Sequence, residues 1–282
     1  MKTKVIVILG QTAAGKSNLA VKIAKKIDGE IISADSRQVY KKLNIGTGKI
    51  THEEMKGIPH HLLEIADPKR KFTVAEYKKL AENKIEEILA RGKTPIICGG
   101  TGFYIDAITK GVFFPEVLPD EKLRKKLYSK SAIALFEYLK KIDSERAKNI
   151  DPKNKVRLIR AIEIAKTLGK VPHLAVKPPS YKFIKIGLYL PPEKLKKKVE
   201  KRVKKMFQAG LLNEIKKIKQ AGVSDKRLKE LGFEYNKPTP EKVIKGTLQY
   251  AKRQMTWFKR DKEIKWFDAS RKLNLKNILS DR

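Results

Sequence analysis

A glycine-rich segment near the N-terminus has the spacing of a phosphate-binding loop. It follows an apolar run, precedes a helical pattern and matches G-x-x-x-x-G-K-[ST] through Gly10, Gln11, Thr12, Ala13, Ala14, Gly15, Lys16 and Ser17. In such loops, backbone N–H groups at the start of a helix surround phosphate oxygens, and the lysine neutralises their charge. The Ser17 hydroxyl is suited to bind Mg2+. The segment therefore predicts a phosphorylated substrate.

An aspartate follows the next apolar run, within Ser33–Tyr40. Ligands of open α/β sheets bind outside the carboxyl ends of the strands, so Asp35 should lie beside the phosphate loop. There it suits a general base that accepts a proton from an attacking hydroxyl or amine. A turn or helix-capping aspartate is the alternative. Arg37, beside it, suits contact with a phosphate or a base.

The phosphate loop alone does not identify the substrate. The apolar run Pro95–Cys98 is followed by Gly99–Gly100, where an NTPase would carry an acidic residue that organises Mg2+. No base-reading motif of G proteins is present. The Thr101 hydroxyl could bind a leaving oxygen, with a tight turn as the alternative. ATP or GTP hydrolysis is therefore not favoured.

Three further arginines are candidates for phosphate contacts. Arg157 and Arg160 lie three residues apart on one face of a predicted helix, although a solvated face would show the same spacing. Arg202 interrupts a lysine-rich helix face, from which it could reach a diphosphate or pair with Glu200. His60–His61 lacks partner ligands at zinc spacing, so we expect no metal site there.

Alternating strand and helix patterns predict an α/β fold, a P-loop NTPase-like parallel sheet flanked by helices. We expect strands at Val5–Leu9, Glu30–Ser33, Pro95–Cys98, Phe183–Leu190 and Ile264–Phe267. Helices are expected from before Leu19 to Ile27, over Val74–Ala90, after Pro192 and over Gln249–Arg260. Between Pro115 and about Ser180 the pattern changes to basic helices. We therefore expect a core domain of residues 1–115 and 181–282, with an inserted helical domain of residues 116–180.

The charge of the chain points to a polyanionic partner. It carries 65 Lys and Arg against 31 Asp and Glu, a formal net charge of +34. Residues 116–282 account for +26 of this and residues 1–115 for +8. Phosphate contacts dominate nucleic-acid affinity, so this excess favours nucleic-acid binding. The alternative, a lysine-rich thermophilic surface, usually adds Glu along with Lys.

Cysteine usage and hydropathy indicate the cellular environment. The single cysteine, Cys98, lies in an apolar run, which indicates a buried small side chain and excludes an intrachain disulfide. No stretch approaches the roughly 18–20 apolar residues of a membrane span, and the N-terminus shows no cleavage site. We expect a cytoplasmic, unprocessed, monomeric protein without membrane attachment.

Taken together, the ordered blocks of this sequence resemble the tRNA dimethylallyltransferase (IPP transferase) family from one end of the chain to the other. The resemblance is carried by residues 10–17, 33–40, 45–49, 59–62, 99–104, 157–163 and 250–258. Some positions depart from the family pattern: Gln11 replaces a usual Pro, and Ala14 a frequent Ser. Leu231–Tyr235 only approximates the family's Ile-Gly-Tyr-Lys-Glu.

The resemblance implies a reaction and its catalytic residues. The phosphate loop would hold the diphosphate of dimethylallyl diphosphate together with Mg2+, without consuming ATP. The acceptor would be N6 of the adenosine just 3′ of the anticodon, flipped out of its stack. Asp35 would take the N6 proton, while Thr101, Lys16 and Arg202 would steady the departing diphosphate.

The resemblance also implies tRNA contacts. The target adenine and its neighbours would be read by Asp35, Ser36, Arg37, Gln38 and Thr101. The anticodon stem-loop would contact Arg157, Leu158, Ile159, Arg160, Ala161, Lys252, Arg253 and Gln254. The inserted helical domain would correspond to the family's tRNA-contacting swivel domain.

Three other functions remain open. A related enzyme prenylates free adenine nucleotides, but a mononucleotide needs no extended cationic surface. A P-loop small-molecule kinase could use Asp35 as its base. A non-catalytic RNA-binding protein could use the phosphate loop as a switch.

Overall fold

The structure, a computed structural model, describes residues 3–172 and 180–279. The chain divides into two compact units, a larger one formed by Met1–Gly111 with Pro178–Arg282 and a smaller one formed by Val112–Lys177. The larger unit is thus discontinuous in sequence, and the smaller unit is an insertion in it. Its boundaries fall a few residues before the positions that the change in sequence pattern suggested.

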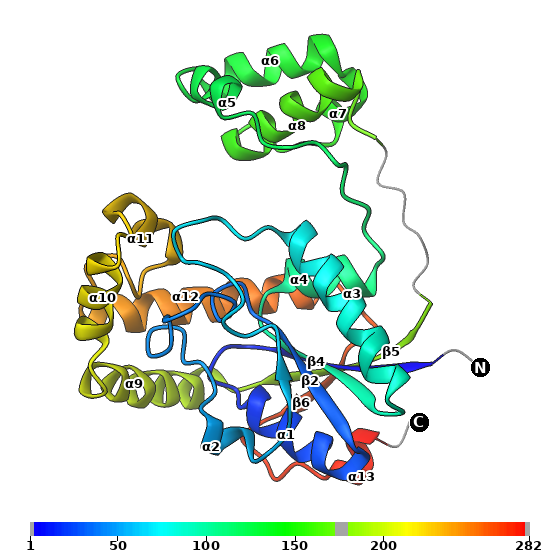
Figure 1. The fold of residues 1–282 in the computed structure, drawn as a ribbon, viewed down its shortest axis with the longest axis vertical. Coiled ribbons are helices and arrows are strands. Elements are labelled where there is room, and N and C mark those ends of the chain that lie inside the picture. Colours follow the sequence, from blue (N-terminus) through cyan, green and yellow to red (C-terminus); the bar gives the residue numbers. More distant parts are fainter. Residues whose placement is uncertain (1–2, 173–179, 280–282) are drawn as a thin grey trace. The chain divides into compact units, whose positions relative to one another are not determined.

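The larger unit is built on one six-stranded sheet with the order β3-β2-β4-β1-β5-β6 (Figure 1). All five pairings are parallel. The strands are β1 (Lys4–Gly10), β2 (Gly29–Ala34), β3 (His60–His61), β4 (Thr94–Gly99), β5 (Lys182–Tyr189) and β6 (Lys265–Asp268). The predicted parallel α/β sheet is confirmed. The short β3 has too few residues to produce a periodic signal, and the sequence did not predict it.

Helices cover both faces of this sheet (Figure 1). They are α1 (Lys16–Ile27), α2 (His52–Met55), α3 (Val74–Ala90), α4 (Gly102–Thr109), α9 (Pro192–Gln208), α10 (Leu211–Gln220), α11 (Asp225–Leu231), α12 (Pro240–Phe258) and α13 (Leu275–Leu279). Successive side chains of a strand point to opposite faces, so the central strand β1 serves two cores. Val5, Val7 and Leu9 pack with α3, α4, α10 and α11. Ile6 and Ile8 pack with α1, α9, α12 and α13.

Helix starts follow their capping residues. Thr73 forms a capping box with Glu76, which fixes the start of α3 at the predicted Val74. Helix α12 begins at Pro240, nine residues before the predicted start at Gln249, because Thr239 caps it and proline is favoured in a first helical turn. Its buried residues recur at helical spacing along the whole helix, at Val243, Thr247, Ala251, Gln254 and Phe258.

The smaller unit consists of four helices among its described residues. They are α5 (Glu121–Tyr128), α6 (Ala132–Ile142), α7 (Ser144–Lys148) and α8 (Lys155–Leu168). At the N-terminus of each helix, the side chain of the N-cap residue accepts a hydrogen bond from a backbone N–H; these N-cap residues are Asp120, Ser131, Asp143 and Asn154. The helices enclose their own apolar core, which includes Leu127, Leu135, Leu139, Leu158 and Ile162.

Cys98 lies in β4 with 7% of its surface exposed. Burial raises the pKa of its thiol to about 12, so the side chain acts as the small apolar group that its sequence context predicts. None of the helices in the described part of the chain combines the length and the apolar character needed to cross a bilayer.

Candidate active site

The phosphate loop lies between β1 and α1, and its lysine has no acidic partner. The Lys16 ammonium donates to the carbonyl oxygens of Gly10 at 3.2 Å and Gln11 at 2.6 Å. Burial lowers the pKa of Lys16 to about 8; nearby Cys98 and Asp35 oppose this shift, and Arg202 adds to it. Lys16 forms no ion pair with any described residue, so its charge is available to an anion at the loop.

Two glutamines fix the loop to its surroundings. The Gln11 side chain accepts from the Leu190 backbone N–H at 2.8 Å. Gln254, on α12, accepts from the Thr12 N–H at 2.7 Å and donates to the Gly100 carbonyl at 2.9 Å. Only 5% of Gln254 is exposed. Gln254 therefore joins the phosphate loop to the end of β4, a role that the sequence did not predict for it.

Asp35 directly follows β2, and its two carboxylate oxygens differ in their hydrogen bonds. Oδ1 accepts from the backbone N–H of Arg37 at 2.8 Å and of Gln38 at 3.3 Å. Oδ2 has no hydrogen bond to any described residue. One oxygen thus stabilises the turn, as the alternative interpretation of the sequence proposed, while the other remains available to a ligand.

Thr101 connects the turns that follow β2 and β4. Its hydroxyl accepts from the Ser36 N–H at 2.9 Å and lies 3.3 Å from the Ser36 hydroxyl. Tyr250, on α12, donates to the adjacent Gly100 carbonyl at 3.3 Å. The ends of these two strands and helix α12 are therefore linked by polar contacts.

Arg202 reaches the phosphate loop from α9. Its Nη1 donates to the Thr12 hydroxyl at 3.3 Å and its Nη2 to the Thr47 carbonyl at 3.2 Å. It forms no ion pair with Glu200, the alternative partner considered from the sequence. Burial lowers the pKa of Arg202, and the nearby acids Asp35 and Glu234 oppose that shift.

Some of these groups line one cavity of about 330 Å³ in the larger unit, whereas Lys16 and Thr101 are not among its lining residues. Of the predicted site residues, it is lined by Thr12, Asp35, Ser36, Arg37, Arg202 and Arg253. The base candidate and the phosphate loop thus face the same space, next to three guanidinium groups. The cavity is also lined by residues that the sequence did not single out, including Phe233, Glu234, Tyr235 and Tyr250.

Glu234 is the least expected of these lining residues. Burial raises its pKa to about 7; its own backbone N–H and the charges of Arg37 and Arg202 oppose the shift, while Asp35 adds to it. Its carboxylate bonds to no other described residue. In the sequence, Glu234 was noted only as part of Leu231–Tyr235, which departs from the family pattern. That departure does not predict a role for its carboxylate.

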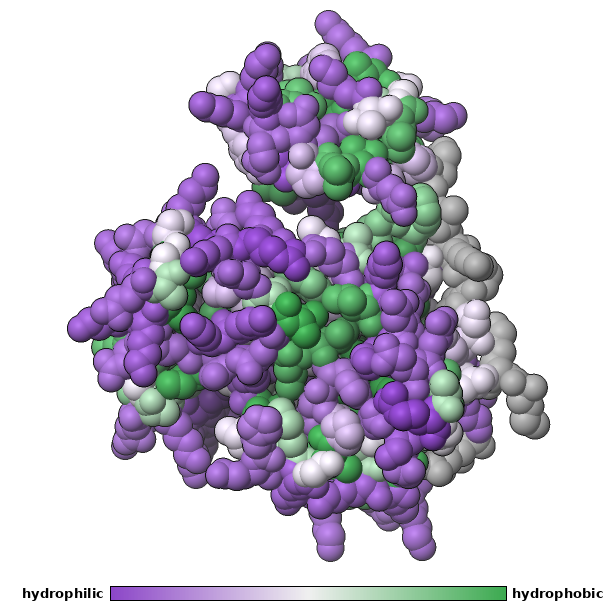
Figure 2. Space-filling model, viewed as in Figure 1, coloured by the Kyte–Doolittle hydropathy of each residue, from purple (hydrophilic) through white to green (hydrophobic). Residues whose placement is uncertain are grey.

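Two predicted contacts lie on the exposed side of α12. Lys252 and Arg253 are exposed, and the Arg253 guanidinium stands 5.8 Å from the centroid of the Tyr250 ring. With Trp257 and Arg260 they border a second hollow of about 460 Å³. Hydrophilic side chains cover much of the face shown in Figure 2, over α9, α10 and α11.

The predicted segment Arg157–Ala161 belongs to α8 of the smaller unit. Leu158, Ile159 and Ala161 are buried in its core. Arg160 donates to Glu163 at 2.5 Å and to the Val117 carbonyl at 2.8 Å. Arg157 is exposed. Within this segment, therefore, direct side-chain contact with RNA is open to Arg157 and to those N–H groups of the Arg160 guanidinium that bond to neither Glu163 nor Val117.

The predicted magnesium ligand, Ser17, is exposed in the first turn of α1. The described residues contain no group of three His, Cys, Asp or Glu side chains that could hold a metal. His61 instead contacts Glu30 at 2.7 Å, and His60 the Ile58 carbonyl at 2.8 Å. A magnesium ion at Ser17 would thus need most of its ligands from a bound diphosphate and water, which suits the preference of this ion.

Comparison with known proteins identifies relatives of this chain. The family model described as IPP transferase matches residues 38–261. A tRNA dimethylallyltransferase from Halothermothrix orenii is 41% identical over 286 residues, which cover 94% of this chain and 87% of the relative. The crystal structure of a full-length tRNA isopentenylpyrophosphate transferase from Bacillus halodurans is 36% identical, with a TM-score of 0.72 over 99% of this chain and 94% of that one. A eukaryotic dimethylallyltransferase acting on tRNA is 27% identical, with a TM-score of 0.82 over 99% and 77%.

Proposed function

The chain belongs to the IPP transferase family, and we propose that it transfers the dimethylallyl group of dimethylallyl diphosphate to N6 of the adenosine just 3′ of the anticodon in tRNA. The observation that carries this proposal is the shared cavity: Asp35 and Thr12 of the phosphate loop line the same space. The products are N6-dimethylallyladenosine and diphosphate. We infer that the enzyme acts as a monomer.

The phosphate loop and two cations would bind the diphosphate. Lys16 lacks an acidic partner, and Arg202 is already oriented by Thr12 and Thr47. Both are half-buried, and desolvation lowers the pKa of each, so a bound anion would interact with them more strongly than it would in water. Mg2+ held by Ser17 would neutralise further charge on the diphosphate. Together these groups stabilise the negative charge that grows on the leaving oxygen.

Asp35 would act as the general base. The N6 nitrogen attacks the allylic carbon, the carbon–oxygen bond to the diphosphate breaks, and one N6 proton must leave. Oδ2 of Asp35 suits this proton because Asp35 lines the cavity and this oxygen bonds to no described residue. Oδ1 is held by the N–H groups of Arg37 and Gln38, which fixes the orientation of the carboxylate.

The adenine must leave its stack to reach the cavity. Phe233 and Tyr250 line the cavity, are partly exposed and offer aromatic surface on which an extruded base could rest. Outside it, Lys252 and Arg253 on α12 would contact the anticodon stem-loop, and so would Arg157 on α8. Gln254 would support this binding indirectly, through its bonds to the phosphate loop.

The proposal is tested by incubating the purified protein with Mg2+, an unmodified anticodon stem-loop and either dimethylallyl diphosphate or ATP. We expect nucleoside mass analysis to detect dimethylallyladenosine only with dimethylallyl diphosphate. A parallel reaction with AMP as acceptor tests the free-nucleotide alternative. Phosphate transfer without prenylation, or faster prenylation of AMP than of the stem-loop, would contradict the proposal.

A further inference from the structure

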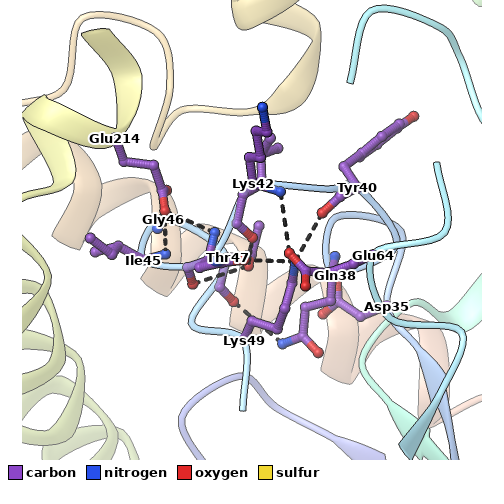
Figure 3. A network of polar contacts seen from close by, with 12 residues as sticks. Asp35, Gln38, Tyr40, Lys42, Ile45, Gly46, Thr47, Lys49, Glu64 and Glu214 are labelled. Carbon is purple, nitrogen blue, oxygen red and sulfur yellow. Dashed lines mark hydrogen bonds and ion pairs between the residues drawn. The ribbon is translucent and has the colours of Figure 1, made fainter. Parts of the chain in front are cut away.

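A single carboxylate from α10 holds three successive backbone N–H groups of the loop at residues 44–49. Glu214 Oε2 accepts from Asn44 at 2.9 Å and from Ile45 at 2.8 Å, and Oε1 accepts from Gly46 at 3.1 Å (Figure 3). Oε1 also accepts from the Tyr235 hydroxyl at 3.0 Å. Burial and the nearby Glu214 carboxylate raise the pKa of Tyr235, so this hydroxyl remains a donor. We call these three N–H groups the loop nest.

The other side of the same loop orients cavity residues. The Thr47 carbonyl accepts from Arg202 Nη2 at 3.2 Å. Gln38 Nε2 donates to the Thr47 and Gly48 carbonyls at 3.4 and 3.3 Å. Gln38 follows Asp35 in the turn after β2. A shift of this loop would therefore move the guanidinium that reaches the phosphate loop and would disturb the turn that carries the proposed base.

The loop fits closely between its neighbours. A Cβ atom on Gly46 would lie 2.6 Å from the Tyr235 ring, and one on Gly48 only 1.9 Å from Arg202 Nη2. At the end of the loop, the Lys49 ammonium binds the Tyr40 carbonyl at 2.9 Å, Asn44 Oδ1 at 2.8 Å and Glu64 at 3.1 Å (Figure 3). Close packing and the contacts of Lys49 therefore hold the loop together with the nest.

Successive N–H groups that point to one spot form an anion-binding concavity. Such a concavity near the proposed diphosphate site would attract a second phosphate, and without any acceptor its N–H groups would lose their bonds. Glu214 satisfies all three groups with a permanent part of the chain. Its distance in sequence, 168 to 170 residues from the loop, makes it a specific tertiary contact.

We infer that Glu214 is a positioning residue for the reaction proposed above: by occupying the loop nest, it fixes the carbonyl oxygens that orient Arg202 and Gln38 at the cavity. The inference rests on the proposed function for its effect on turnover. The binding of an anion by the nest does not depend on that function. The two parts can therefore be tested separately.

The test uses Glu214→Ala, which empties the nest, and acetate as the probe that refills it. Loss of charge-assisted hydrogen bonds is expected to lower kcat/KM for dimethylallyl diphosphate by about tenfold or more. The dissociation constant for the anticodon stem-loop should stay within about twofold, because the exposed cations are unchanged. Acetate should restore part of the lost activity, and Glu214→Asp should lose less than Glu214→Ala. Glu200→Ala removes an equal charge from the exposed face of α9 and should behave as the wild type.

Amide hydrogen exchange gives a readout that does not require activity. In Glu214→Ala the amides of Asn44, Ile45 and Gly46 should exchange faster, and acetate should slow them again. Unchanged exchange at these amides overturns the inference even if the wild type makes no product. In an active wild type, a loss of activity that merely follows the unfolded fraction, without rescue by acetate, also overturns it. Failure of the wild type to form dimethylallyladenosine contradicts the proposed function instead.

Discussion

Two carboxylates, a buried one in the smaller unit and a half-buried one in the larger unit, have opposite surroundings. Glu163 in the smaller unit is 1% exposed and accepts from Arg124 at 2.8 and 2.9 Å, from Arg160 at 2.5 Å and from the Asp120 N–H at 2.7 Å. Burial alone would raise the pKa of Glu163, but these hydrogen bonds lower it. Glu234 in the larger unit lines the cavity, bonds to no other described residue, and has a pKa raised by burial to about 7.

This difference indicates that Glu163 has a structural role, whereas Glu234 has the surroundings of a carboxylate that faces a ligand. A buried charge with all its partners present gives a fixed arrangement of helices. A carboxylate that remains unpaired beside a cavity is destabilising in the empty protein, and such groups gather where a ligand binds. The same contrast holds for two lysines, buried Lys185 and half-buried Lys16. Lys185 pairs with Asp261 and Glu263, both at 2.7 Å, whereas Lys16 in the phosphate loop has no acidic partner.

The largest effect is expected at Asp35. Asp35→Asn retains an oxygen for the N–H groups of Arg37 and Gln38 but cannot accept the N6 proton. We expect kcat to fall by about 10²–10⁴-fold with little change in stem-loop affinity. Single-turnover prenylation and a binding titration measure the two quantities. The matched control is Asp67→Asn, because exposed Asp67 also accepts an N–H two residues later, from Lys69 at 2.8 Å. Similar losses in both variants would indicate a turn effect and contradict the role of a base.

The next largest effect is expected from Glu163→Ala. The change leaves the guanidinium groups of Arg124 and Arg160 without their shared partner, which should destabilise the smaller unit by about 3–5 kcal/mol. Hydrogen exchange on the full chain should show faster opening of α5 to α8, with the sheet of the larger unit unaffected. Glu137→Ala removes an exposed carboxylate from α6 and should stay within about 0.5 kcal/mol of the wild type. An equally small effect at Glu163 would show that the network contributes little.

Features encoded by short segments could be predicted from the sequence. The phosphate loop, the central strands and α3 each follow from residues adjacent in the chain, so their patterns are visible without tertiary information. The placement of Asp35 at the end of a strand follows from the same kind of pattern. These features account for the sheet and for one wall of the cavity.

The remainder of the site depends on contacts between distant residues. Glu214 meets its loop across about 170 residues of sequence, and Glu234 acquires its surroundings from α9 and from the turn after β2. Arg160 shows the limit of local patterns: Glu163, three residues later, could have indicated an ion pair, but Arg124 completes the network from 39 residues away from that glutamate. Charge and spacing alone do not distinguish a cation bound to a protein carboxylate from one available to RNA.

A pH-dependent effect is expected from Glu234→Gln. The native pKa of about 7 exceeds the usual 4.5, so between these values the folded protein binds more protons than the unfolded one. Stability from this group therefore falls as the pH rises from 4.5 to 7, and the full cost persists above 7. Glu234→Gln should be more stable than the wild type by on the order of 1–3 kcal/mol at pH 8, and the difference should shrink toward pH 5.

Urea denaturation of both proteins between pH 5 and 8 measures this difference. The nearby charges of Asp35, Arg37 and Arg202 are common to both, so the comparison isolates the carboxyl at position 234. Glu200→Gln, on the exposed face of α9, should retain the pH dependence of the wild type. A constant difference between Glu234→Gln and the wild type across this range would show that Glu234 is not protonated near neutral pH.

The smallest effect is expected within α8, where Arg160 is paired within the protein and Arg157 is available to a ligand. Arg157 is exposed and has no side-chain ion pair among the described residues, so Arg157→Gln should remove one phosphate contact. Stem-loop affinity should fall a few-fold, and the slope of its logarithm against that of the salt concentration should decrease by about 0.7–0.9. Arg160→Gln should instead lower the stability of the smaller unit, because Glu163 loses one of its partners.

Lys140→Gln removes an equal charge from the exposed face of α6 and serves as the control for the general field of the unit. Salt-dependent binding titrations of the three variants distinguish the possibilities. A larger change of slope for Arg157→Gln than for Lys140→Gln indicates a specific contact, because a diffuse field would weaken binding equally in both. Equal slopes would remove Arg157 from the proposed tRNA surface.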